Sequence, residues 1–600
     1  MARSFMRPGP QRVIEDFEHN EFFHPSSQQH YEMLQRDGRY RLRRYQLDAD
    51  GNPINVLEQP VDWILGSGDH ARTYLYQTPA GELYQLPIAW YSQTKSWGMA
   101  PGFDRKDHEG ITRRVRRECM FCHNAYPNVA PASDGYEAPQ VFPPDLPQGT
   151  GCQRCHGPGA EHVLRAFGKS AGRPQDAIVN PARLSPERRD DICFQCHLQP
   201  SVALPGLRRF GRGDYSFQPG ESLADYLVPL DVVEQGRQRS ERFEINHHPY
   251  RLRQSRCYLE SHGALTCLTC HDPHRQVPEA QRAAHYRAAC LACHQSDACK
   301  LEPMARQNQS SPAVDPGDCV TCHMPRRRTQ DVVRVVMTDH LIRREPGGAE
   351  LLAPLEEHDP VLVDVQFLDP ERAPTGALAR VYLAAAVVRA GGGASTAAVD
   401  ALEQALAATR PPQIEPYLDL GRGQLQQKRF AAAQQTLTAV LERYPNSLLG
   451  LEWLAIAQAG LGKPEAAIEL LGRAPKRGGG APEIEFNLGR LLAGLGRQKP
   501  AIEHYRAALS ARPNQVAAWY HLGNAHAELG ELEQAVESYR RALEIDPSHS
   551  EAYLKIGQTL LKIGRRPEAL RYWRHGAKVA ARPQAIAAAL EQAASASSSP

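Results

Sequence analysis

The sequence has no uninterrupted apolar run of about eighteen residues, so it offers no segment for a membrane-spanning helix. It also has no excess of charge of either sign, because 70 Lys and Arg nearly balance 68 Asp and Glu. Without a basic stripe that could neutralise a phosphate backbone, we expect no nucleic acid among its partners. Residues 1–20 lack the apolar core of a secretory signal peptide.

Cysteine is missing from the C-terminal part of the chain, because all 14 cysteines lie between Cys119 and Cys322. At 600 residues the chain is too long for one hydrophobic core. We therefore expect at least two folded units with different chemistry, one rich in cysteine and one without it.

Twelve of the cysteines form Cys-x-x-Cys pairs, and each pair is followed directly by histidine. The six copies are Cys119, Cys122 and His123; Cys152, Cys155 and His156; Cys193, Cys196 and His197; Cys267, Cys270 and His271; Cys290, Cys293 and His294; and Cys319, Cys322 and His323. This is the pattern of c-type haem attachment.

The chemistry of haem attachment explains this spacing. Two thiols three residues apart on a helical turn can form thioethers with the two vinyl groups of a porphyrin, and the next histidine can bind the iron. Zinc sites and disulfides are the alternatives, but a zinc site does not require histidine after every second cysteine. We therefore predict six covalently bound c-type haems (haem c, iron), with the six motif histidines as proximal ligands. Such attachment takes place outside the cytoplasm, so we expect a periplasmic or otherwise extracytoplasmic protein whose export signal lies upstream of residue 1.

The N-terminal part of the chain divides by its motifs. Residues 1–110 carry none and are predicted to be a haem-free N-terminal segment of the motif-bearing domain. The alternating pattern on either side of Pro79-Ala80-Gly81 predicts a small β-hairpin there. Residues 111–345 hold the six motifs among short helices and loops, where the haems themselves would form the core. Residues 346–370 are predicted to be a linker.

Residues 371–582 repeat with a period of 34 residues. Leu420-Gly421, Leu454-Ala455, Leu488-Gly489, Leu522-Gly523 and Ile556-Gly557 stand at this spacing, as do Ala433, Ala467, Ala501, Ala535 and Ala569. The pattern resembles the tetratricopeptide repeat, whose helical hairpins stack into an α-solenoid that binds a peptide or a partner protein. A plain helical bundle is the alternative. Residues 583–600 are predicted to be a flexible tail.

The motif-bearing part resembles the multihaem cytochrome c superfamily, most closely the cytochrome c-554-like domain that is fused to tetratricopeptide repeats in bacterial proteins. The marks of the resemblance are GSGDHARTYLY, RECMFCHNAYP, CQRCHGPGAEH, SRCYLESHGALTCLTCHDPH, CVTCHMPRRR and TDHLIRR. The resemblance implies a mainly α protein that transfers electrons through closely packed bis-histidine haems. The sequence departs from the related nitrite reductases, because none of its motifs replaces histidine with lysine.

A bis-histidine iron needs a distal ligand on the opposite face of the porphyrin. His274 follows His271 by only three residues, too few to reach round the same ring, so it should serve a neighbouring haem. His162 stands six residues beyond His156 and should likewise serve a neighbouring haem, although six extended residues span up to about 20 Å, which leaves the same haem as an alternative. His24, His70 and His340 match positions of isolated histidines in the resembling family. These five are the predicted distal ligands; His248, His262 and His108 compete for the sixth place, and His19, His30, His247 and His285 are predicted to be surface residues.

Two function classes remain open, and the protein's status as an enzyme stays undecided. The first is an electron carrier whose repeat arm docks redox partner proteins. The alternative is an oxidoreductase that acts on a small nitrogen or sulfur compound at one open iron. A third interpretation is an adaptor whose repeats are the main function. Cys257 and Cys299 lie outside the motifs and are either a disulfide or two free thiols.

Overall fold

The computed structural model describes residues 4–9, 12–127, 134–198, 207–295, 318–344, 348–357, 361–391, 393, 395–474 and 481–595. The chain forms two compact units. The motif unit is Thr150–Pro374, and the repeat unit joins Arg3–Gly149 to Thr375–Pro600. Residues 1–110, which the sequence grouped with the haem motifs, thus fold with the repeats.

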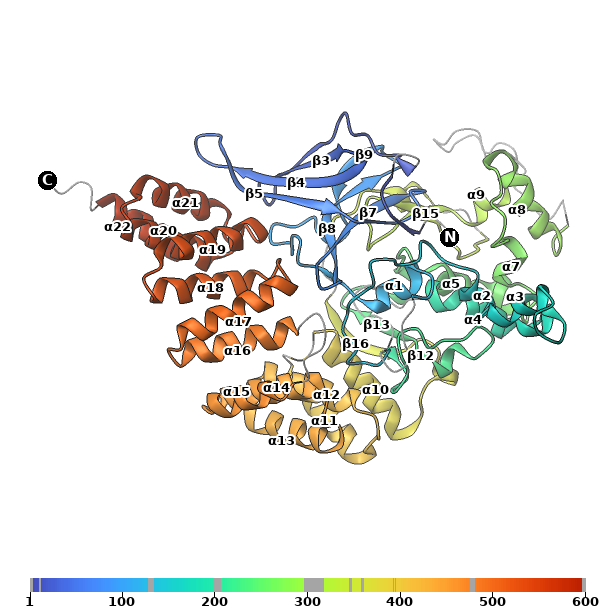
Figure 1. The fold of residues 1–600 in the computed structure, drawn as a ribbon. Helices are drawn as coiled ribbons and strands as arrows, with labels where there is room; N and C mark the ends of the chain where they lie inside the picture. Colours follow the sequence, from blue (N-terminus) through green and yellow to red (C-terminus); the bar gives the residue numbers. More distant parts are fainter. Residues whose placement is uncertain are drawn as a thin grey trace. The chain divides into compact units, whose positions relative to one another are not determined.

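The N-terminal part of the repeat unit is built from two antiparallel sheets, drawn in blue in Figure 1. The six-stranded sheet contains β1 (Phe5–Met6), β6 (Trp63–Leu65), β7 (Ala71–Gln77), β8 (Leu83–Tyr91), β9 (Ser96–Met99) and β10 (Arg114–Val115). The four-stranded sheet contains β2 (Glu21–His24), β3 (Gln29–Arg36), β4 (Arg39–Leu47) and β5 (Pro53–Val61).

The predicted hairpin is confirmed as β7 and β8, whose turn is closed by a 2.8 Å hydrogen bond from the Gly81 amide to the Thr78 carbonyl. The sequence predicted only this hairpin, whereas the hairpin is part of a six-stranded sheet and a second, four-stranded sheet lies in the same region. In β4, Tyr40, Leu42 and Arg44 are buried in strict alternation, the pattern of a strand with one face in the core.

The first haem motif lies in the same unit, on α1 (Arg117–His123). Met120 of this helix packs into a buried apolar cluster with Trp63, Leu75 and Phe142. The Ser4 hydroxyl donates a 3.0 Å hydrogen bond to the His123 carbonyl. The end of the first motif is therefore held by the core of the six-stranded sheet.

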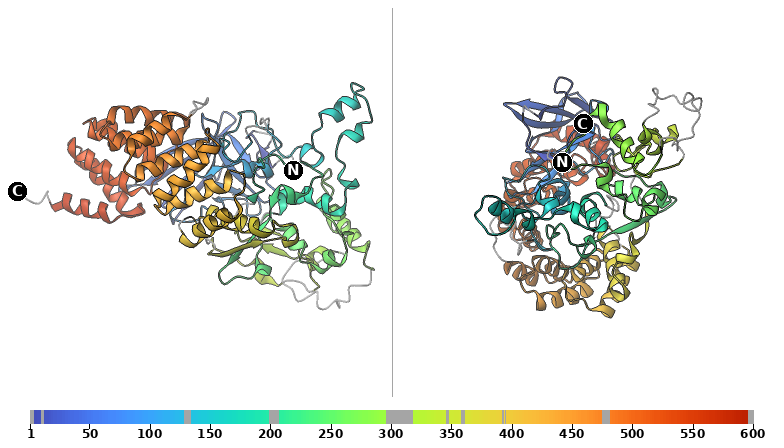
Figure 2. Two further views of the ribbon diagram at one scale, coloured as in Figure 1. Left: turned by 90° about the horizontal axis from the view of Figure 1, so that it is seen from below. Right: turned by 90° about the vertical axis from the view of Figure 1, so that its right-hand side faces the viewer.

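The C-terminal part of the repeat unit is a run of antiparallel helices stacked in sequence order (Figures 1 and 2). The helices are α10 (Gly376–Arg389), α11 (Thr396–Thr409), α12 (Glu415–Gln426), α13 (Phe430–Arg443), α14 (Leu448–Gly460), α15 (Pro464–Gly472), α16 (Pro482–Gly494), α17 (Gln498–Ala511), α18 (Val516–Glu528), α19 (Leu532–Ile545), α20 (Ser550–Lys562), α21 (Arg566–Val579) and α22 (Gln584–Ser595). The last helix occupies most of the segment that the sequence predicted as a flexible tail, and its Ile586 is fully buried.

Small residues let paired helices approach closely. A Cβ atom added at Gly523 of α18 would stand 2.6 Å from the Tyr539 ring of α19, and one at Gly489 of α16 would stand 2.6 Å from the Tyr505 ring of α17. The 34-residue recurrence of glycine seen in the sequence is thus a packing requirement, because the opposing aromatic ring fills the space of the missing side chain.

The N-terminal strands pack against the helices of the same unit. Buried Arg44 of β4 donates to the Ile545 carbonyl at the end of α19, and Asn55 of β5 donates to the Tyr553 hydroxyl of α20 at 2.6 Å. Arg512 forms a paired contact with Glu82, at 2.6 and 2.8 Å. One edge of the solenoid is therefore occupied by the chain's own N-terminal segment.

The motif unit has little regular structure. Its helices are α2 (Gln153–His156), α3 (Ala160–Ala166), α4 (Pro186–His197), α5 (His248–Leu252), α6 (Arg256–Glu260), α7 (Cys267–Cys270), α8 (Arg282–Leu291) and α9 (Cys319–His323). Within its described residues, the strands form three two-stranded pairs, β11 (Leu207–Arg208) with β12 (Leu227–Val228), β13 (Leu230–Glu234) with β16 (Leu362–Phe367), and β14 (Arg326–Arg328) with β15 (Val336–Thr338). Strand β16 lies in the segment predicted as a linker. Across the described ranges, no helix combines the length and apolar character needed to cross a bilayer.

Candidate haem-binding sites

Each of the six motifs lies on or at the end of a short helix. The third motif forms the last turn of α4, and the sixth fills the whole of α9. The fifth motif begins in the last turn of α8 and continues beyond its end. A helical turn brings two cysteines three residues apart onto one side, which is the arrangement that thioether attachment requires.

The thiols of successive motifs in the motif unit lie close together. The side chains of Cys193 and Cys267, from the third and fourth motifs, are hydrogen-bonded, and this bond with Cys193, together with burial, raises the pKa of Cys267. Cys290 and Cys319, from the fifth and sixth motifs, are also hydrogen-bonded. The attachment points are therefore packed against one another.

Three motif histidines each lie beside a second histidine from elsewhere in the chain. The ring centroids are 5.8 Å apart for His156 and His274, 6.2 Å for His197 and His248, and 6.1 Å for His271 and His340. Two imidazoles that bind one metal from opposite sides, with metal–nitrogen distances of about 2 Å, have centroids roughly 6 Å apart. The donor set fits a bis-histidine iron at all three positions.

Backbone carbonyls orient several of these rings. The Nδ1 atom of His156 lies 2.8 Å from the Val179 carbonyl, and that of His323 lies 2.7 Å from the Arg343 carbonyl. Among the predicted distal ligands, Nδ1 of His162 and of His340 also contacts a carbonyl, at 2.8 and 3.1 Å. Metal-binding histidines commonly donate one ring N–H in this way, which leaves Nε2 for the metal.

Burial keeps four of the rings neutral. It lowers the pKa of His197, His248 and His271, and it lowers the pKa of His340 to about 4. A neutral imidazole has the lone pair that a metal ion needs. The Nδ1 atom of His248 is buried and makes no hydrogen bond within the described part of the chain.

A buried ion pair fixes two of the histidine-bearing segments. Arg251 of α5 donates to both carboxylate oxygens of Asp339, at 2.9 and 2.8 Å, and both side chains are fully buried. Arg251 lies one helical turn after His248, and Asp339 directly precedes His340. The His248 and His340 rings are 4.4 Å apart. The pair therefore positions both rings.

The structure places His24 and His70 in the repeat unit, where the His24 ring lies 5.8 Å from that of His108. The Nδ1 atom of His24 contacts the Ser27 hydroxyl at 2.7 Å, and its Nε2 atom contacts Asp104 at 3.1 Å. Nδ1 of His70 lies 3.2 Å from the Gln93 amide. Their assignment as distal ligands stays a prediction, with both ring nitrogens of His24 engaged by protein groups.

The remaining candidates differ in burial. His108 is buried and contacts the Tyr31 hydroxyl at 3.2 Å, and His247 is fully buried, although the sequence predicted a surface residue there. His262 and His285 are exposed.

The sequence ranked His248 only as a competitor, because no spacing rule shows that α5 approaches the third motif. The choice between a Cys257–Cys299 disulfide and two free thiols stays untested, since Cys299 lies outside the described residues.

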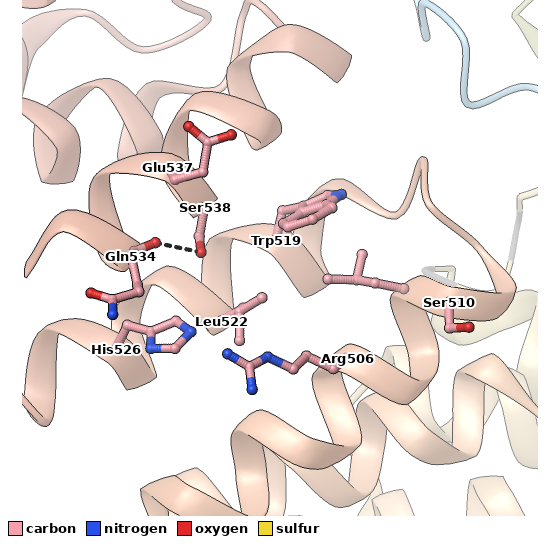
Figure 3. A pocket seen from close by; sticks show the side chains of 9 residues that line it. Arg506, Ser510, Trp519, Leu522, His526, Gln534, Glu537 and Ser538 are labelled. Carbon is pink, nitrogen blue, oxygen red and sulfur yellow. Dashed lines mark hydrogen bonds between the residues drawn. The ribbon is translucent and has the colours of Figure 1, made fainter. Parts of the chain in front are cut away.

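The solenoid has a groove of about 420 Å³ between α17, α18 and α19 (Figure 3). It is lined by Arg506, Leu509, Ser510, Trp519, Leu522, His526, Gln534, Glu537 and Ser538. Leu522 and the ring of His526 are buried, and Nδ1 of His526 contacts Glu531 at 2.5 Å. The volume lies at the small end of the range for ligand pockets.

Comparison with known proteins identifies the repeats. A family model described as "TPR repeat" matches residues 489–530 and 523–564, and one described as "Tetratricopeptide repeat" matches residues 418–482. No curated protein matches the chain. The helices within residues 418–482 and 489–564 are therefore tetratricopeptide repeats, a class of module that mediates protein–protein interaction.

Several solved structures are similar to part of the chain. The crystal structure of MamA protein is 26% identical, covering 28% of this chain and 91% of that chain with a TM-score of 0.26. MamA from Desulfovibrio magneticus RS-1, from residue 41 to its end, is 21% identical, covering 30% and 95% with a TM-score of 0.26. YrrB, described as a TPR protein with an unusual peptide-binding site, is 18% identical, covering 32% and 99% with a TM-score of 0.27.

Proposed function

We propose that the protein is an extracytoplasmic hexahaem c-type cytochrome that transfers electrons, with tetratricopeptide repeats that dock its redox partner proteins. The observation that carries the proposal is the six-fold Cys-x-x-Cys-His motif, with each copy on or at the end of a short helix. Haem supplies one-electron transfer when it is bound. The chain supplies two thiols and a proximal imidazole at each site.

The histidine pairs support an electron carrier over an enzyme. Where two imidazoles bind one iron, a substrate has no open position. The pairs His156–His274, His197–His248 and His271–His340 have the ring separations that such ligation needs. His274 beside His156, a histidine of another motif, also agrees with the sequence argument that His274 serves a neighbouring haem. Among the described residues, the contacts between thiols of different motifs support short distances between the cofactors.

The alternative is an oxidoreductase with one open iron that acts on a small nitrogen or sulfur compound. Electron paramagnetic resonance of the oxidised protein at low temperature distinguishes the two, because a six-coordinate bis-histidine iron is low-spin. We expect low-spin signals only, and no change of the reduced spectrum under carbon monoxide. A high-spin signal together with carbon monoxide binding would favour the oxidoreductase.

The docking role of the repeats has its own test. Because the family matches identify a protein-interaction module, we expect a redox partner to bind the full-length protein, and to bind more weakly to a full-length variant with Arg506→Glu and Glu537→Lys at exposed positions of the groove. Electron transfer between the haems of the variant should continue. Equal partner binding by both proteins would remove the docking role and leave the carrier proposal intact.

A further inference from the structure

Cys257 lies outside the six motifs, yet it contacts one of them. Its Sγ atom is 4.0 Å from Nε2 of His294, the histidine of the fifth motif. It also interacts electrostatically with Cys290 and Cys293, the two cysteines of the same motif. Cys257 thus lies beside the attachment point and the proximal ligand of one predicted haem.

The local fold holds Cys257 in this place. It lies in the first turn of α6, and the hydroxyl of the next residue, Tyr258, donates a 3.2 Å hydrogen bond to Asp190 of α4. The other oxygen of Asp190 accepts from the Cys267 amide at 3.3 Å. Asp190 is buried and joins α4, α6 and α7, so the position of Cys257 is set by the elements that carry the third and fourth motifs.

The separation of the two atoms matches that of two ligands on one metal. With metal–nitrogen and metal–sulfur distances of about 2.0 and 2.3 Å, a nitrogen and a sulfur on opposite sides of one ion lie roughly 4.3 Å apart. Three other motif histidines, His156, His197 and His271, each lie beside an imidazole, with ring centroids 5.8 to 6.2 Å apart. His294 faces a sulfur.

We propose that Cys257 is the second axial ligand of the haem at the fifth motif, which would make this site histidine–thiolate and not bis-histidine. This inference rests on the proposed function, because it requires a haem on Cys290 and Cys293. The Cys257 thiol would release its proton to solvent on binding, and no electron is transferred in this step. An anionic thiolate favours ferric over ferrous iron, so this haem would have the lowest potential of the six.

The test uses the full-length protein matured with six haems and two cysteine variants. In wild type we expect one low-spin resonance with the narrow spread of g values typical of thiolate ligation, with about one sixth of the low-spin intensity. Cys257→Ser should lose this resonance and keep six haems by intact mass. Cys257→His should replace it with a bis-imidazole resonance. Cys299→Ser, which changes the other cysteine outside the motifs, should retain it.

Three results would overturn the assignment. They are a wild-type spectrum with no thiolate resonance, an unchanged spectrum in Cys257→Ser, and a Cys257–Cys299 disulfide in a non-reducing peptide map. The wild-type spectrum decides the question even if the serine variant does not fold. A protein that carries no haem would overturn both this inference and the proposed function, whereas six haems without a thiolate signal would overturn the ligand assignment alone.

Discussion

In the motif unit, a buried ion pair between Arg251 and Asp339 fixes the positions of single residues. Asp339 accepts two hydrogen bonds from Arg251, and Arg343 contacts the same carboxylate at 3.3 Å. The Arg251–Asp339 contacts lower the pKa of Asp339 below its usual value, although burial acts in the opposite direction. Removing one partner of a buried pair leaves the other charge without compensation, which costs far more than an exposed pair contributes.

The first prediction concerns this pair. Asp339→Asn should lower the free energy of unfolding by about 3–5 kcal/mol, because it leaves the buried Arg251 guanidinium without its counter-charge. Chemical denaturation of the holoprotein measures the change. The matched control is Glu260→Gln, which breaks the exposed pair of Arg256 and Glu260 and should have no measurable effect. A similar small effect for both variants would contradict the positioning role of Asp339.

The second prediction concerns the distal ligands. His274→Met should raise the reduction potential of one haem and leave the other five unchanged, because methionine in place of histidine stabilises ferrous iron. His504→Met changes a histidine of the repeats whose Nδ1 atom contacts Glu485 at 2.7 Å, and it should leave all potentials unchanged. A spectroelectrochemical titration resolves the six haems. If the two variants titrate like wild type, His274 is not a ligand.

The spacing of the motifs predicted the proximal ligands, because haem attachment requires two cysteines and a histidine that lie close together in the sequence. The distal ligands come from distant segments, so their identity depends on how those segments fold. His274 and His340 were predicted and lie beside motif histidines. His248 was ranked below His24, because nothing in the sequence shows which of these segments approaches a motif.

Among the secondary-structure elements, the helices were more predictable than the strands. The 34-residue period in the sequence predicts the repeats directly, because every copy places a small residue where the two helices of the repeat cross. The strands β3 and β4 carried a signal that was missed, because Asp37-Gly38 between two alternating segments is typical of a type I′ hairpin turn. Both residues have positive φ, 51° and 70°.

The third prediction tests the helix crossings of the repeats. Gly523→Ala should lower the free energy of unfolding by about 1–3 kcal/mol, because the added methyl group overlaps the Tyr539 ring. Thermal unfolding followed by circular dichroism measures the loss. Gly494→Ala is the control, because a Cβ atom at this helical position meets nothing within 4 Å, and alanine should be neutral or stabilising. Equal destabilisation by both substitutions would count against the crossing as its cause.

The fourth prediction is a pH dependence within α14. Burial, with repulsion from Glu483, raises the pKa of Glu452 from 4.5 to about 7. The unfolded chain then loses this proton at lower pH than the folded one, so the stability contributed by this group falls as pH rises from about 4.5 to about 7. Glu452→Gln should therefore stabilise the protein more at pH 8 than at pH 5, by up to roughly 3 kcal/mol. Glu469→Gln, at an exposed site of α15, should show no such pH difference; the same profile in both variants would refute the prediction.

For the whole molecule, the division into units could not be predicted from the sequence. The motifs suggested that residues 1–110 belong with the haem-binding part, whereas Arg44, Asn55 and Glu82 contact residues more than 400 positions away in the repeats. No local sequence pattern predicts such long-range contacts, because polar side chains of these types are equally common on the exposed face of a strand. The repeats thus have a partner within the chain in addition to any external one.

The fifth prediction measures this internal contact. In a double-mutant cycle of Glu82→Gln and Arg512→Met, the two single substitutions should each destabilise the full-length protein. Their effects should be non-additive, with a coupling of about 1–3 kcal/mol, because the two side chains form one paired contact. Denaturant unfolding provides the four values. Additive effects would show that the N-terminal strands and the repeats are not coupled through this pair.

The intact mass of the full-length protein tests the central claim most directly. After expression with the c-type maturation machinery, we predict a polypeptide heavier by six haems, all retained under denaturing conditions because they are held by thioether bonds. Replacing Cys119 and Cys122 with alanine should reduce the count by one. A wild-type protein that carries four or fewer haems would contradict the account.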